Sequence, residues 1–283
     1  MYQLPVAIEK AIRRYEKIET GGLTLYPVLV KEYSEHLIAR PAVEVMHQSL
    51  PVALMRMPLL SALYQIDYAA AMEGKPPTGL FSRTLLALAL SLRLGTGLAP
   101  EQRVGMFQVA VDRRSPDKLK CLRFTDSDGK EKEIRPEQYA QIRQIIAAQN
   151  GIRLESEQAN PDIVRAKRDM AASGSLRLDT SIEDLITATA LFCHVEESEI
   201  EDWAILKLNR RSDAIRRVLS YLVCGIGEMQ GTTWNGGNPA PHPFFRRQDE
   251  GNGLFSAMGN AADGAKQEPP TAARILAETS ENF

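Results

Sequence analysis

Apolar residues recur at helical spacing over most of the first 230 positions of the chain. In residues 6–18 they stand three or four positions apart among charged residues, which predicts a helix that ends at the Thr20-Gly21-Gly22 sequence. From residue 31 to residue 94 the same spacing continues in stretches divided by Pro41, Pro51 and Pro58. Because proline interrupts helices, this pattern predicts a first half of several packed helices.

Two parts of the chain have strand character instead. Residues 23–30 form a short β-branched and aromatic run with Pro27 inside it, which is typical of an edge strand. After Gly105 come three short strand-like runs separated by turn-forming residues, at residues 106–111, 119–124 and 133–135. They predict a small three-stranded antiparallel meander.

The second half returns to helical patterns. Residues 137–149 follow Pro136, carry four apolar side chains on one face and end at Asn150-Gly151, which predicts a helix. Further on, Ser181 with Asp184 and Ser198 with Glu201 have capping-box spacing, so we expect helices from each serine to about residues 193 and 208. A third helix is expected over residues 211–224.

The pattern changes near Gly231, where glycine, asparagine, proline and alanine become frequent. We therefore expect a mainly α protein, with a helical body, the small meander and a flexible C-terminal tail. The expected regions are a helical region with a short edge strand (1–104), the meander (105–135), a second helical region (136–230) and the tail (231–283).

Charge and composition exclude some function classes. The 283 residues carry 34 basic and 36 acidic side chains, a net charge of −2. The chain therefore has no overall field for nucleic acid, and such binding would need a local patch. Three cysteines without CxxC spacing indicate reduced thiols in a cytoplasm-like compartment. Early charges at the N-terminus argue against a secretion leader, and the longest apolar run, residues 80–94, contains two arginines and predicts a buried helix rather than a membrane span.

No arrangement of residues indicates a reaction, so we expect no catalytic, cofactor-binding or metal-binding residues and no enzyme. The Asp126-Ser-Asp-Gly129 sequence lacks the other ligands of a calcium loop and predicts a hairpin turn. Cys193 and His194 lack the paired spacing of a zinc site. There is no GxSxG sequence, and Gly95-Thr96-Gly97 lacks the lysine of a phosphate-binding loop.

Residues 181–222 have the length of a helix-turn-helix, which makes a DNA-associated regulator an alternative. The helix that would enter the groove begins with Glu197, Glu199 and Glu201, however, and these carboxylates repel phosphates. The arginines further on, at positions 210, 211, 216 and 217, are typical of a solvated helix face. We therefore regard nucleic acid as an unlikely partner.

The tail concentrates three large aromatic side chains, Trp234, Phe244 and Phe245, in a segment that cannot fold alone. Such rings on a flexible arm dock either on a partner or on the protein's own body. We take these three residues as the main candidates for partner binding. Trp203 is a lesser candidate, equally compatible with a place in the core.

Several stretches together resemble one protein family. They are Leu25-Tyr-Pro-Val-Leu-Val-Lys-Glu-Tyr33, the Asp126 turn followed by Tyr139-Ala-Gln-Ile-Arg-Gln-Ile-Ile-Ala-Ala-Gln149 and Asn160-Pro161, Ile182-Glu-Asp-Leu-Ile186 with Ile200-Glu-Asp-Trp203 and Asn209-Arg-Arg-Ser-Asp213, and Gly236-Gly-Asn-Pro-Ala-Pro-His-Pro-Phe-Phe245. These stretches cover about half of the chain. They resemble the tail assembly chaperones encoded by bacteriophages and prophages.

The resemblance implies a non-enzymatic function in virion morphogenesis. Tail assembly chaperones bind the long tape measure protein and keep it soluble while tail tube subunits polymerise around it. The expected partners are thus the tape measure protein, possible contacts with the tail tube protein and self-association, with no membrane partner. The expected location is the cytoplasm of an infected or lysogenic bacterium. Family members are sometimes extended by a translational frameshift, and both the short and the extended form stay open. A structural tail or baseplate component is the main alternative.

Overall fold

A computed structural model describes residues 4–126, 128–155, 160, 162–164, 166, 181–233, 238 and 240 of the chain. The chain divides into two compact units. Unit 1 comprises Met1–Val164 and Leu176–Arg216, and unit 2 comprises Arg165–Ser175 and Arg217–Phe283. The tail from residue 234 onward lies outside the described residues except for positions 238 and 240, so the expected flexible tail is not described.

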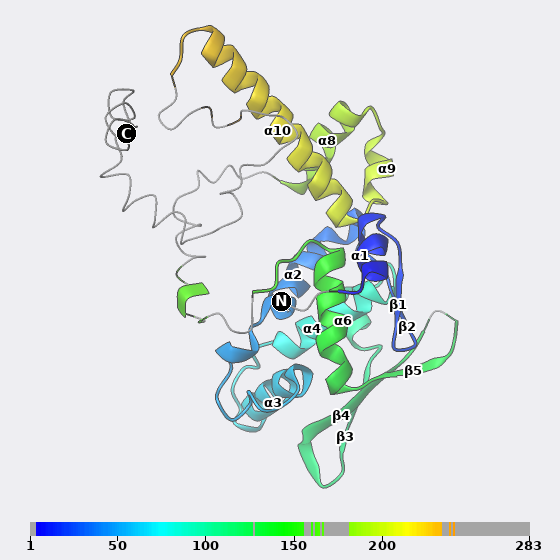
Figure 1. Cartoon of the computed structure of the whole chain (residues 1–283). Helices are drawn as coiled ribbons and strands as arrows, with labels where there is room; N and C mark the ends of the chain where they lie inside the picture. The colour runs from blue at the N-terminus through cyan, green and yellow to red at the C-terminus, as the bar shows by residue number, and fades with distance from the viewer. Residues whose placement is uncertain are drawn as a thin grey trace, which may run out of the picture. The chain divides into compact units, whose positions relative to one another are not determined.

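Helices form most of the regular structure (Figure 1). The helices are α1 (Val6–Arg13), η1 (Val30–Glu32), α2 (Tyr33–Glu44), η2 (His47–Ser49), α3 (Leu59–Met72), α4 (Leu80–Ser91), α5 (Pro100–Val104), α6 (Pro136–Gln149), α8 (Ile182–Cys193), α9 (Glu197–Glu201) and α10 (Ile205–Met229). The strands are β1 (Ile18–Thr20), β2 (Leu23–Leu25), β3 (Gln108–Asp112), β4 (Ser115–Thr125) and β5 (Glu131–Ile134). The prediction of a mainly α protein with a three-stranded antiparallel sheet is confirmed.

The meander has the strand order β3-β4-β5, with antiparallel pairing throughout. Register shifts near Ala110 and Val111 give β4 extra residues relative to β3, which marks β-bulges. Between β4 and β5, the carboxylate Oδ1 of Asp126 accepts the backbone N–H groups of Asp128 and Lys130 at 3.0 and 2.9 Å. Asp126 therefore serves the hairpin turn, as predicted.

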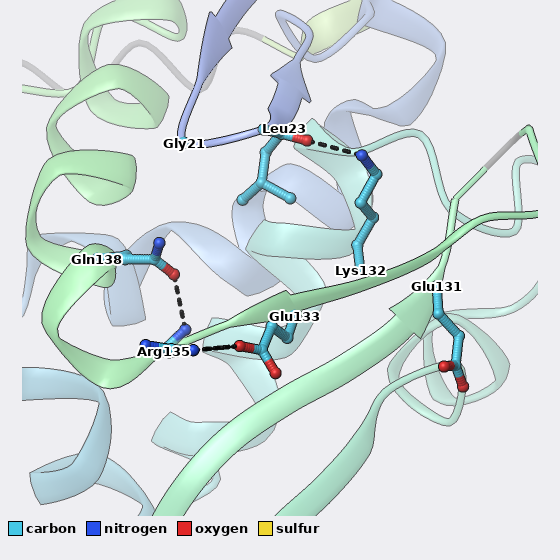
Figure 2. A pocket seen from close by; sticks show the side chains of 8 residues that line it. Gly21, Leu23, Glu131, Lys132, Glu133, Arg135 and Gln138 are labelled. Atoms are coloured by element: carbon cyan, nitrogen blue, oxygen red, sulfur yellow. Dashed lines mark hydrogen bonds and ion pairs between the residues drawn. The ribbon is translucent and has the colours of Figure 1, made fainter.

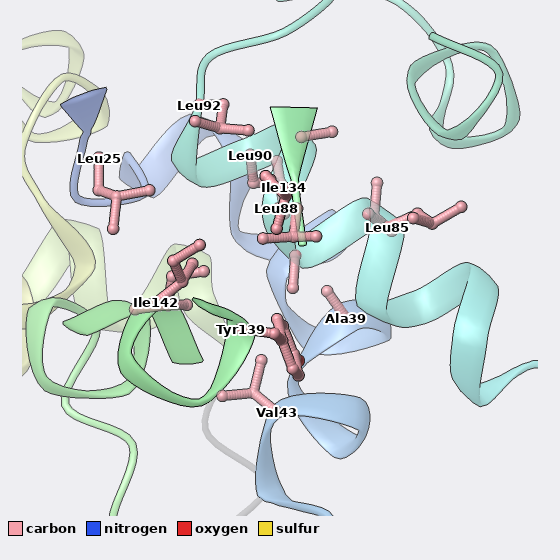
Figure 3. Close-up of a cluster of buried hydrophobic side chains, with 14 of the residues drawn as sticks. Leu25, Ala39, Val43, Leu85, Leu88, Leu90, Leu92, Ile134, Tyr139 and Ile142 are labelled. Carbon is pink, nitrogen blue, oxygen red and sulfur yellow. The ribbon is translucent and has the colours of Figure 1, made fainter. Parts of the chain in front are cut away.

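One large hydrophobic core holds the helices and the sheet of unit 1 together. Figure 3 shows Leu88 of α4, Ile134 of β5 and Tyr139 of α6 meeting in this core. The predicted buried helix is confirmed, because every residue of α4 from Thr84 to Ser91 is buried. The four apolar side chains of α6 also face this core, which explains the helical spacing there.

Two helix boundaries differ from the sequence prediction. Helix α1 ends at Arg13 rather than near residue 18, and the Gly21-Gly22 pair forms a hairpin turn between β1 and β2. Both glycines have positive φ, which such two-residue turns require. The prediction of a helix break at Pro41 is also wrong, because α2 continues through it. Ala39, Ala42 and Val43 bury in the core on both sides of Pro41, and this packing holds the helix together.

An extended segment after β2 connects several elements of unit 1 through its backbone. The Tyr26 N–H donates to the carbonyl of Ser91 at the end of α4, at 2.7 Å. The Val28 N–H donates to the side-chain Oδ1 of the buried Asn150 at 2.9 Å. The Asn150 amide in turn donates to the carbonyl of Ile146 at 2.8 Å, so both halves of this side chain are satisfied. The segment thereby connects α4 with the end of α6.

A buried ion cluster joins α5 to η1 and α2. The Arg103 guanidinium is almost fully buried and contacts Glu32 at 2.9 Å and Glu35 at 3.2 Å. Burial raises the pKa of Glu35, an effect that Arg103 opposes. The guanidinium keeps two carboxylates in the interior, so the cluster depends on Arg103 for its charge balance.

Replacing Asn150 with alanine tests the connection between the extended segment and α6. Asn150→Ala leaves the buried Val28 N–H without an acceptor, so we expect the free energy of unfolding to fall by about 1–3 kcal/mol. Urea denaturation measures this loss. The exposed Asn209→Ala on α10 is the control and should change the value by less than about 0.5 kcal/mol. Equal effects of the two variants would contradict this role of Asn150.

The buried His36 side chain should make the free energy of unfolding depend on pH in the acid range. Burial of the imidazole, helped by the charge of Arg40, lowers its pKa from 6.5 to about 4. The unfolded chain therefore binds more protons than the native state between these values, and stability falls as the pH drops through this window, by up to about 3 kcal/mol. We expect His36→Gln to remove this contribution. Denaturation of both proteins across the window checks it, and parallel pH profiles would contradict it.

Candidate interaction surface

Helices α8 and α9 and the first turns of α10 form a small helical module within unit 1, with its own core. Its buried side chains include Ala190, Ile200, Trp203 and Leu208, and Val30 of η1 packs with them. The predicted capping box at the start of α8 is confirmed, since the Ser181 hydroxyl accepts the Asp184 N–H at 3.1 Å and the Asp184 carboxylate accepts the Ser181 N–H.

The second predicted capping box is wrong. Helix α9 begins after Glu196 and ends at Glu201, and α10 then runs without a break from Ile205 to Met229. A short β-bridge between Leu29 and Ala204 interrupts the expected helix, with the Val30 N–H donating to Trp203 and the Ile205 N–H donating to Val28. Pairing with the extended segment thus decides where α9 ends.

Trp203 lies in the core of this module. Its side chain is buried, and the Lys207 ammonium sits over its ring at 3.6 Å from the centroid. Burial of the ammonium lowers the pKa of Lys207. The flat face of the indole is therefore occupied by a cation from the first turn of α10. The other three predicted partner-binding residues, Trp234, Phe244 and Phe245, lie outside the described residues.

Helix α10 carries a continuous apolar seam with alternating spacings of three and four residues. Its positions are Ile205, Leu208, Ser212, Ile215, Leu219, Leu222, Ile226 and Met229. Such spacing is the heptad pattern of helices that pack side by side with another helix. Only Ser212 is polar, and its hydroxyl lies 3.2 Å from that of Thr189 on α8.

The two ends of the seam have opposite environments. Ile205 and Leu208 are buried in unit 1. In the part of α10 that belongs to unit 2, the seam is exposed, by 41% at Leu219, 50% at Leu222, 55% at Ile226 and 90% at Met229. Large apolar side chains exposed along one helix face indicate an interaction site. We call the exposed part, residues 219–229, the α10 stripe.

Sequence reasoning missed the α10 stripe. It ended the third helix near residue 224 and considered the arginines of residues 210–217 instead of the apolar positions beyond them. The heptad spacing from Ile215 onward was a sufficient signal, because Leu219, Leu222, Ile226 and Met229 all follow it. The tertiary structure adds that these four side chains are exposed among the described residues.

A cavity of about 480 Å³ opens between the β1–β2 turn and β5 in unit 1 (Figure 2). Three of its four charged side chains have partners, and the fourth, Glu131, is exposed. Lys132 donates to the carbonyl of Gly22 at 3.0 Å, and Arg135 contacts Glu133 at 2.9 Å. The Arg135 N–H donates to Gln138, which closes the start of α6. The lining contains no serine, cysteine or histidine, so it does not by itself indicate a reaction.

The described residues also contain no group of three or more histidine, cysteine, aspartate and glutamate side chains that could hold a metal ion. Within the same residues, no helix combines the length and apolar character needed to cross a membrane. Comparison of the chain with protein families, with curated proteins and with solved structures found no match. The α10 stripe is thus the candidate site that the geometry favours.

Substitutions along the seam test whether the α10 stripe is free in the isolated protein. We expect Leu222→Lys to change the free energy of unfolding by less than about 0.5 kcal/mol, because the side chain is half exposed. The buried Leu208→Ala should cost about 2–5 kcal/mol. Chemical denaturation of both variants gives the comparison. A loss at Leu222 as large as that at Leu208 would mean that another part of the same chain covers the stripe.

Proposed function

We propose that this protein is a non-enzymatic phage tail morphogenesis factor that holds an apolar helix of its partner against the α10 stripe. The exposed heptad positions of α10 carry the proposal. The resemblance to tail assembly chaperones suggests the tape measure protein as that partner and the cytoplasm of the bacterial host as the place. A tape measure chain is long and helical, and its apolar stripes need cover before assembly.

The apolar spacing of the α10 stripe and its lack of charge suit the apolar face of an amphipathic partner helix. Ten consecutive residues of α10, 218–227, contain no charged side chain. A partner helix with its own apolar positions three and four residues apart can interdigitate with Leu219, Leu222 and Ile226. Because this stretch has no charged side chains, it does not require a matching pattern of charges on the partner helix. This favours a binding partner chosen for its apolar face, as expected of a chaperone's client.

The size of the stripe favours reversible binding. Covering the exposed parts of its four side chains contributes about 1 kcal/mol each, at roughly 25 cal/mol per Å² of apolar surface. Association itself costs at least about 4 kcal/mol. The stripe alone therefore supports only a weak contact. Trp234, Phe244 and Phe245 would add the remaining contacts if the tail also engages the partner, and a weak contact allows release during tail assembly.

The DNA-associated alternative gains little support from the helical module. Its middle helix, α9, has only five residues, and Glu197, Glu199 and Glu201 on it are exposed. These carboxylates would face the phosphates of a bound duplex. A structural tail or baseplate component remains the main competitor, and it differs from a chaperone in staying in the mature tail.

A capture experiment from phage-producing cells tests the proposal. We expect the full-length protein to retain the tape measure protein, identified by mass spectrometry. A triple lysine variant of Leu219, Leu222 and Ile226 should retain at least about tenfold less, because charges in the seam prevent helix packing. The matched control places three lysines at other exposed apolar positions, Leu37, Ile38 and Leu191.

Each outcome separates the candidates. Loss in the stripe variant with retention in the control supports the proposal. Capture of tail tube or baseplate subunits alone favours the structural component and overturns the chaperone. Equal capture by all three proteins removes the stripe from the contact. A chain that ends at Gln230 then reports whether the aromatic residues of the tail add to the binding.

A further inference from the structure

The β3–β4 hairpin of unit 1 carries a concentration of exposed basic side chains. Arg113 and Arg114 form its turn, and Lys118, Lys120 and Arg123 follow along β4. All five are exposed. Leu119 is buried between the two lysines, and Leu122 and Phe124 are buried on either side of Arg123, so the three β4 cations project away from the core.

These five cations have no side-chain partners in the part of the chain that the structure describes. None of them takes part in an ion pair, a side-chain hydrogen bond or a cation–π contact among the described residues. The hairpin also carries two aspartates, and neither pairs with the side chain of one of these cations among the described residues. Asp112 accepts the Arg114 backbone N–H at 2.9 Å, and Asp117 contacts Gln65 of α3 at 3.5 Å. The hairpin is therefore locally basic in a chain whose net charge is −2.

The shape of the patch decides which anion it fits. The outer part of the hairpin, residues 112–120, is a two-stranded antiparallel ribbon, whereas β5 pairs with β4 from Leu122 onward. Helix α3 holds one side of this ribbon, since the Tyr64 hydroxyl donates to the Pro116 carbonyl at 2.9 Å, and the basic side chains remain exposed. The major groove of B-form DNA admits such a ribbon, whereas the major groove of duplex RNA is too narrow. Lysine and arginine at the turn and along one strand are suited to phosphates on the two sides of a groove.

The hairpin lacks what other polyanions would need. Single-stranded nucleic acid is held mainly by stacking on aromatic rings, and Phe124, the one aromatic residue of β3 and β4, is buried. Membrane surfaces are engaged by basic residues together with inserted apolar side chains. Val109 is the one large apolar side chain exposed on these two strands, and it is only 38% exposed.

We propose that the β3–β4 hairpin binds the phosphate backbone of double-stranded DNA without sequence preference. Its contacts are Arg113, Arg114, Lys118, Lys120 and Arg123. The net charge of the chain and the acidic residues at the start of the helix after Glu196 argued against nucleic acid as a partner. Neither property applies to the β3–β4 hairpin. The inference does not depend on the α10 stripe, so either proposal can fail alone.

Fluorescence anisotropy with a labelled DNA duplex of mixed sequence tests this inference on the full-length protein. We expect binding at about 50 mM salt that weakens steeply towards about 200 mM, since each phosphate contact adds about 0.9 to the slope of log K against log salt. Changing all five cations to glutamine should weaken binding at least about tenfold and flatten this slope. Circular dichroism confirms that the variant is folded.

A matched control changes five other exposed cations to glutamine, and none of them has an ion-pair or side-chain hydrogen-bond partner among the described residues: Lys10, Arg13, Arg56, Arg83 and Arg153. Binding by this control within about twofold of the unchanged protein supports the hairpin, because both variants have the same net charge. Equal loss in both would show a general charge effect and overturn the site.

Three further outcomes also overturn the inference. The first is that binding is lost only when Arg210, Arg211, Arg216 and Arg217 are changed to glutamine. The second is that the protein binds a single strand or duplex RNA more tightly than duplex DNA, and the third is that it binds vesicles containing phosphatidylserine but not the DNA duplex.

Discussion

The segment from Tyr26 to Glu32, an extended stretch followed by η1, imposes the constraint on which unit 1 depends, because its backbone bonds with three elements and its last side chain with a fourth. It donates to a carbonyl at the end of α4, donates through the Val28 N–H to the buried Asn150 side chain at the end of α6, and forms a bridge with Ala204 before α10. Its last residue, Glu32, receives the guanidinium of Arg103 from α5. Buried backbone groups must be paired, so these elements can only pack where the segment satisfies them.

That constraint fixes the start of α10 and therefore which of its residues are buried. The bridge at Ala204 places Ile205 and Leu208 in unit 1, and the same apolar seam then continues along α10 to side chains that are exposed among the described residues. A helix whose pattern is longer than its own partner surface has apolar positions left for another molecule. The proposed chaperone function and the reversible character of its contact both follow from this surplus.

The sequence predicted those elements whose local pattern agrees with their environment. Helix α6, the buried α4 and the meander were expected because spacing, turn residues and burial all indicate the same structure. The boundaries at Arg13 and Glu201 were not, since a hairpin and a β-bridge formed with distant residues override the local helical spacing there. Of the predicted site residues, only Trp203 is described, and its burial under Lys207 depended on a fold that spacing does not specify.

By itself the sequence determined the mainly α class, the three-stranded meander and the lack of a recognisable catalytic or metal-binding pattern, because propensity, periodicity and ligand spacing are local properties. The tertiary structure decided which apolar and charged side chains remain free. The seam of α10 reads alike along its whole length, and only packing distinguishes the buried Leu208 from the exposed Leu222. Likewise, nothing in the local sequence distinguishes the lysines of β4. They form a basic surface because the fold exposes them on one hairpin without partners among the described residues. Burial and pairing depend on residues far apart in the chain, which is why the sequence alone could not specify either surface.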